Sequence, residues 1–157
     1  MSDLSAVDVA IRQAELILKL YDLRREATMR EARSYIGGEF LPASAEELVA
    51  IVSSGTKQGA FVLQVYGYWD MVASFVDSGA LTPQLVYNTC QEMYFQYAKI
   101  QPFLAGFRQQ MNLPEWMSGI ERQVEGTEAG RARLATMRKN LEAIAATRVD
   151  SLNPSRA

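Results

Sequence analysis

Apolar residues recur every three or four positions along most of the chain, which is the spacing of one face of an α-helix. The first such pattern runs from Ser5 to about Tyr21 and carries two apolar lines. One line consists of Val7, Ile11, Ala14, Leu18 and Tyr21. The other line, on the far side, consists of Val9, Leu16 and Leu20. We expect the domain to cover the first line and a second subunit to cover the other, unless a later helix of the same chain does so.

Two shorter helices are predicted next. One lies within the stretch of about residues 23–40 and ends at its Gly37-Gly38 pair, because such a pair favours a left-handed cap. The following helix begins with Ser44 and Glu47 in the spacing of a capping box and stops at Gly55.

The central part of the fold is predicted to be two long helices over about residues 57–77 and 83–111. The second begins at the Thr82-Pro83 pair, and Pro102 should kink it or divide it in two. A short helix from Pro114 and a last helix over about residues 127–148 complete the pattern. No segment alternates with a period of two, so we predict an all-α bundle of six or seven helices. It should form a single domain over residues 1–150, followed by a frayed tail over 151–157.

Composition narrows the possible functions. The chain has 157 residues, of which 48% are hydrophobic and 22% charged, as in a folded globular domain. Its 16 Lys and Arg residues against 18 Asp and Glu residues give a net charge of −2, so no nucleic-acid partner is expected. The sequence contains no histidine, which removes the commonest general base and most zinc sites. We therefore predict no metal, no cofactor and no catalytic residue, and an enzyme ranks only third among the candidate functions.

The sequence also indicates a cytoplasmic protein without a membrane span. The N-terminal segment lacks the basic start and the continuous apolar core of a signal peptide. The most apolar run, residues 60–76, is shorter than a bilayer requires and contains Asp70. The only cysteine, Cys90, lies in an apolar helical stripe, where packing is its expected role.

The one acidic residue in that apolar run, Asp70, has two interpretations. It lies on a narrow solvent-exposed strip or pairs with an arginine of a neighbouring helix, with four candidates: Arg24, Arg25, Arg33 and Arg108. Alternatively it belongs to an aromatic groove between the fourth and fifth helices. The candidate ligand-binding residues of that groove are Tyr66, Trp69, Asp70, Tyr94 and Tyr97. We predict a non-enzymatic interaction or scaffold module that forms a homodimer, with a small-molecule-binding protein as the alternative.

Two stretches carry a resemblance to known proteins. They are LYDLRREATMREARSYI and VASFVDSGALTPQLVYNTCQEMYFQYAKIQPFLAGFR. Together they resemble a group of small bacterial helical proteins that share a domain of unknown function, over roughly residues 20 to 110. In that group a membrane-spanning helix often precedes the core helices, whereas charged residues interrupt the first helix here. The resemblance implies an all-helical fold, and no catalytic residue can be carried over from it, because the group has none assigned.

Overall fold

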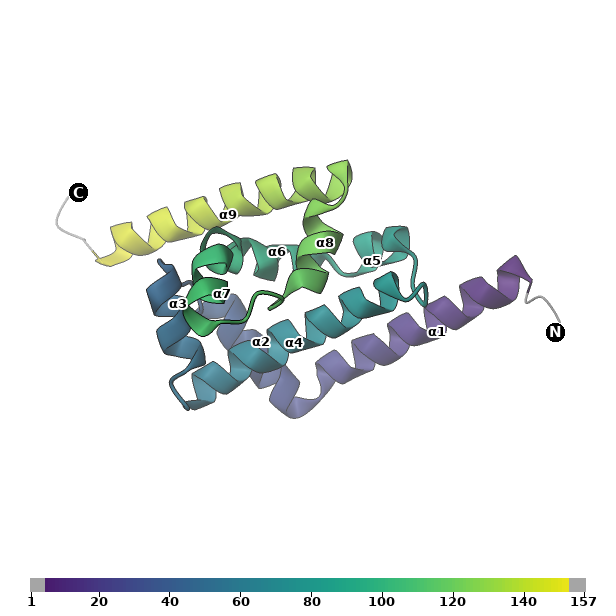
Figure 1. Cartoon of the computed structure of the whole chain (residues 1–157), viewed down its shortest axis with the longest axis horizontal. Helices are drawn as coiled ribbons and strands as arrows, with labels where there is room; N and C mark the ends of the chain where they lie inside the picture. The colour runs from purple at the N-terminus through teal and green to yellow at the C-terminus, as the bar shows by residue number, and fades with distance from the viewer. Residues whose placement is uncertain (1–4, 153–157) are drawn as a thin grey trace.

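The computed structural model describes residues 5–152, and this part of the chain is helical and contains no strand. The all-α class is therefore confirmed. Figure 1 shows α1 (Ala6–Arg25) and α9 (Glu128–Leu152) along opposite edges of the molecule, with α4 (Lys57–Asp77) between them. The start of α1 and the end of α9 lie at opposite ends of the long axis.

The remaining helices are shorter and fill the space around α4. They are α2 (Ala27–Gly38), α3 (Ala45–Val52), α5 (Pro83–Thr89), α6 (Gln91–Ile100), the single 3-10 turn η1 (Gln101–Phe103), α7 (Leu104–Met111) and α8 (Ser118–Glu125). The expected six or seven helices are too few. The difference comes mainly from the segment predicted as one long helix, which forms three α-helices and the 3-10 turn.

Two breaks divide that segment. Pro102 lies in η1 and divides the predicted long helix, as expected. A proline inside a helix removes one backbone donor and clashes with the preceding turn. The other break, at Cys90, was not predicted. Its backbone angles are φ −114° and ψ 49°, and the hydroxyl of Thr89 donates to the carbonyl of Leu85. The ψ angle of Cys90 lies outside the α-helical range, so α5 ends there.

Several predicted helix ends are also corrected. Gly37 and Gly38 remain within α2, so the expected left-handed cap at this pair is wrong. Left-handed glycines occur instead at Gly55 and Gly79, with φ of 65° and 78°. α8 begins at Ser118 rather than at Pro114, because the preceding residues form turns.

The frayed tail over residues 151–157 stays a prediction. α9 extends to Leu152, and residues 153–157 lie outside the described part of the chain.

The core is built mainly from one face of α4 and from almost the whole surface of α6. α2 and α8 pack against α4, while α9 packs against α6. The largest fully buried side chains include Trp69, Tyr66, Tyr97, Phe40, Phe107 and Ile36. The prediction that the two central segments form the core is thus confirmed for α4 and α6.

The apolar lines of α1 are exchanged relative to the prediction. Leu20 is buried and Leu16 is half-buried against the core, whereas the other line faces away from it. Polar contacts fix this orientation: the Tyr68 hydroxyl donates to the carbonyl of Leu20 at 2.7 Å, and Gln13 Oε1 accepts from the N–H of Thr82 at 3.3 Å. The line expected to face a second subunit is therefore partly used by the domain itself.

Candidate functional site

The four aromatic residues of the predicted groove come together, but as parts of the core. Tyr66 and Trp69 on α4 and Tyr94 and Tyr97 on α6 are all buried. The Tyr66 hydroxyl donates to the carbonyl of Gln96 at 2.8 Å, and burial raises the pKa of Tyr66 well above its ordinary value. None of the pockets considered below is lined by any of these four rings. Ligand binding at these residues stays a prediction, and it would require the rings to separate.

Asp70 has a partner that the sequence analysis did not consider. Its carboxylate is half-buried, and Oδ1 accepts the N–H of Ile120 at 3.2 Å at the start of α8. Met117, the N-cap residue of α8, is left-handed and supplies no side-chain cap. Asp70 therefore caps this helix from α4, where its negative charge also suits the helix dipole. Asp70 also borders a small pocket of about 230 Å³ beside Trp116.

The arginines considered as partners of Asp70 are engaged elsewhere. Glu92 accepts from Arg24 Nη2 at 2.8 Å and from Arg33 Nη2 at 2.5 Å. Arg108 pairs with Glu121 at 2.9 Å. The Arg25 guanidinium lies 6.0 Å from the centre of the Tyr21 ring.

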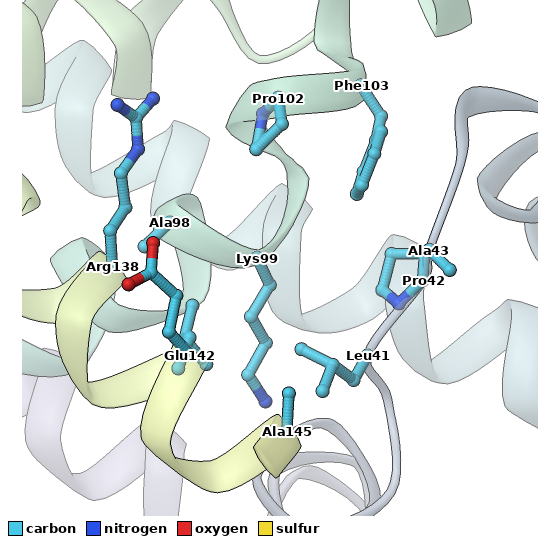
Figure 2. A pocket seen from close by; sticks show the side chains of 11 residues that line it. Leu41, Pro42, Ala43, Ala98, Lys99, Pro102, Phe103, Arg138, Glu142 and Ala145 are labelled. Atoms are coloured by element: carbon cyan, nitrogen blue, oxygen red, sulfur yellow. The ribbon is translucent and has the colours of Figure 1, made fainter. Parts of the chain in front are cut away.

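A different pocket, of about 340 Å³, lies between α6, η1, α9 and the loop that joins α2 to α3 (Figure 2). Its lining residues are Leu41, Pro42, Ala43, Ala98, Lys99, Pro102, Phe103, Arg138, Leu141, Glu142 and Ala145. Most of these side chains are apolar, and three are charged. Since cavities of roughly 300–1,000 Å³ with a few converging polar groups are typical of ligand sites, this pocket is the candidate binding site of the fold.

Lys99 is the most unusual residue in this pocket. Only 4% of its surface is exposed, and its ammonium group donates to the backbone carbonyl of Ile36. The Phe95 ring centre lies 5.0 Å from Nζ. The pKa of Lys99 is lowered to about 8, mainly by burial and also by the nearby charge of Arg148, while the charge of Glu92 opposes this shift. Within the described residues no carboxylate forms an ion pair with this ammonium.

Arg138 forms a second cationic element of the pocket. Its Nε atom is buried and has no hydrogen-bond partner among the described residues. Arg138 belongs to a run of mixed charge, and such a run predicts a solvent-exposed helix face. In the structure, however, Arg138 is half-buried. Glu142 lies one turn further along α9 and is exposed. This pocket could not be predicted from the sequence, because its walls come from three segments that are far apart in the chain.

The second notable feature is the exposed line of α1, which we call the α1 seam and define as Val7, Ile11, Ala14, Leu18 and Tyr21. Its four large side chains are 66%, 52%, 65% and 53% exposed in chain order. Steps of four and three residues alternate along the seam, as in the interface positions of a coiled coil. Residues 5–12 are exposed on every side, and Figure 1 shows this end of α1 extending past the other helices.

Comparison with known proteins adds the family. Residues 9–127 match the family described as Domain of unknown function (DUF4760). The chain belongs to this family. The match confirms the resemblance inferred from the sequence, and it extends from α1 to the turn after α8. Lys99 therefore lies inside the family domain, whereas the α9 wall of its pocket follows it. No curated protein and no solved structure matches this DUF4760 chain.

Two further properties bear on the function of this DUF4760 domain. Among residues 5–152, no helix combines the length and the apolar character needed to cross a membrane. In the same part of the chain, acidic and cysteine side chains do not gather in groups of three or more that could hold a metal ion.

Proposed function

We propose that this protein is a non-enzymatic interaction module that forms a homodimer through the α1 seam. The observation that supports this proposal is the row of four large, exposed apolar side chains on one face of α1. At about 25 cal/mol per Å² of apolar surface, burying such a row on both copies offers several kcal/mol towards association, before the entropic cost is subtracted. A helix whose first turns have no packing partner is also only marginally stable in water, so a partner would stabilise it.

The seam suits a second copy of the same chain. Ala14, its smallest residue, lies midway between Val7 and Tyr21 and allows two helices to approach closely. Ile11 and Leu18 occupy the same heptad position, one heptad apart. Ile11 is β-branched, and a β-branched residue at this position favours two-stranded pairing. A two-fold pair is the simplest closed assembly, because the same surface serves both copies.

Charge favours a parallel orientation. Asp8, Glu15 and Asp22 each follow a seam residue directly and repeat every seven positions, so they form an acidic border along one side. In an antiparallel pair the two acidic borders would face each other and repel. In a parallel pair each acidic border faces the opposite border of the other helix, where Ala10 and Ile17 carry no charge.

A cytoplasmic location belongs to the same proposal. The only cysteine, Cys90, is buried, and burial raises the pKa of its thiol. Such a thiol suits a reducing compartment, where it serves packing rather than disulfide formation.

The proposal is tested by light scattering on the purified protein and on two matched double variants. Ile11→Glu with Leu18→Glu places charges in the seam and should yield a monomer. Leu63→Glu with Met71→Glu introduces the same two charges at exposed apolar positions of α4 and should leave the dimer intact. A monomeric wild type, or a dimer that only the α4 variant dissociates, would exclude the seam as the interface.

A further inference from the structure

We propose that the pocket beside Lys99 binds a medium-chain monocarboxylate, with the carboxylate on the Lys99 ammonium group and the hydrocarbon chain against the apolar wall. This site is independent of the α1 seam, because no residue of α1 lines the pocket. Nothing in the family description assigns a ligand to this region.

The first property that selects the ligand is the charge of the pocket. The Lys99 ammonium is almost completely removed from water, and its one hydrogen bond goes to a neutral carbonyl group of α2. A buried cation without a counter-charge is unfavourable, and a bound carboxylate would supply that charge in a strong hydrogen bond. Arg138, with its buried and unpartnered Nε, adds positive charge on the α9 side. The site therefore favours an anion over a neutral or cationic ligand.

The shape and lining of the pocket select the rest of the ligand. Its volume of about 340 Å³ is at the small end of the range of roughly 300–1,000 Å³ for ligand pockets. Leu41, Phe103, Leu141 and Ala145 contribute to an apolar wall. Figure 2 shows the Lys99 side chain running between the two sides of the pocket, with Leu41 and Ala145 beside its amino group. A single charged end and a short apolar chain match this arrangement better than a polar metabolite does.

Binding should depend on the protonation of Lys99. The charged groups near it are few: Arg148, Arg138 and Glu142 on α9 and Glu92 on its own helix. α2 faces it with a backbone carbonyl, and the loop from Leu41 to Ala43 contributes no titratable side chain. Because the pKa of Lys99 is about 8, a carboxylate should bind tightly well below this pH and weakly well above it. Binding near pH 8 should also draw a proton onto the protein.

Calorimetric titration with octanoate tests the inference on the full chain, with 1-octanol as the neutral ligand of the same chain length. Lys99→Met keeps a long side chain but removes the charge, and should weaken octanoate binding by about tenfold or more, the equivalent of one charge-assisted hydrogen bond. The matched control is Lys139→Met, which removes an exposed cation of α9 outside the pocket and should leave octanoate affinity unchanged.

Four results would support the assignment together: millimolar or tighter octanoate binding, much weaker 1-octanol binding, weaker octanoate binding above pH 8, and loss of affinity in Lys99→Met alone. If Lys99→Met does not fold, the comparison of the two ligands and of the two pH ranges on the wild type still decides. The inference is overturned if the wild type does not bind octanoate, if 1-octanol binds equally well, or if affinity is the same on both sides of pH 8.

Discussion

Asp70 illustrates how a single side chain acquires a role that its own helix does not reveal. Its position in an apolar run predicts either a solvent-exposed strip, a salt bridge or a ligand groove, whereas the carboxylate caps α8 by accepting the N–H of Ile120. A Cβ atom on Gly119 would lie 2.7 Å from Asp70 Oδ1, so a larger residue at this position would displace the capping carboxylate. Sequence reasoning could not find this contact because the capping residue and the capped helix are far apart in the chain.

We expect Asp70→Ala to lower the free energy of unfolding by roughly 0.5–2 kcal/mol, the usual effect of losing a helix N-cap. Asp70→Asn retains an oxygen acceptor and should lower it by less. Urea unfolding followed by circular dichroism measures both. If Asn proves as destabilising as Ala, the carboxylate does not act as a cap.

Lys99 provides a residue-scale prediction for pH. The folded protein releases the Lys99 proton near pH 8, whereas the unfolded chain holds it to about pH 10.5. Between these values the unfolded state binds more protons, so the free energy of unfolding should rise with pH. Up to pH 10, where ordinary tyrosines begin to ionise, we expect a gain of roughly 2 kcal/mol relative to Lys99→Met. Urea unfolding of both proteins over this range measures the difference, and a constant difference would show that Lys99 is not desolvated.

At the scale of single elements, local signals located some helix ends and missed others. Ser44 and Thr82 cap α3 and α5 as predicted, because their hydroxyl groups accept from backbone N–H groups three residues later. Glu26 also caps α2 and separates it from α1, with its carboxylate accepting the N–H of Met29 at 3.0 Å. Glutamate is not a common cap, so the sequence did not indicate this one. The break at Cys90 likewise has no glycine or proline to announce it.

The connection between α1, α2 and α6 depends on Glu92, which joins Arg24 and Arg33 in one partly buried network. Glu92→Gln leaves both guanidinium groups without their counter-charge, and we expect a loss of about 2 kcal/mol or more in unfolding free energy. Glu31→Gln is the matched control, since it makes the same change in the exposed pair with Lys57 and should cost less than about 0.5 kcal/mol. Equal effects in chemical denaturation would contradict a structural role for the network.

For the whole molecule, the sequence predicted the composition of the core better than the surfaces that remain free. Trp69 and Tyr97 lie on strongly apolar faces, and both are buried. α6 is buried on nearly all sides, so Lys99 is enclosed although its neighbours in sequence give no such signal. The two lines of α1 are both apolar, and only contacts made by distant residues decide that Leu20 faces the core and Leu18 faces outward. Helical periodicity identifies faces, whereas tertiary contacts decide which face is covered.

A single-domain organisation over residues 1–150 stays a prediction, and it has a clear consequence. Because α2, α4, α8, α9 and α6 form a continuous series of packed neighbours, we expect one cooperative unfolding transition. Far-ultraviolet circular dichroism and the fluorescence of Trp69 and Trp116 should therefore give coincident urea curves. Separate midpoints for the two signals would indicate independently unfolding parts.

The α1 seam is tested most directly by disulfide trapping at its centre. In the proposed dimer, Ala14 of one copy lies beside Ala14 of the other, so Ala14→Cys should cross-link under mild oxidation into a dimer that reductant dissociates. Ala50→Cys, an exposed alanine on α3, is the matched control and should remain a monomer on a denaturing gel. The buried thiol of Cys90 should not react in either protein. Cross-linking of Ala14→Cys alone is the expected result, and equal cross-linking of both variants, or of neither, would contradict self-association through α1.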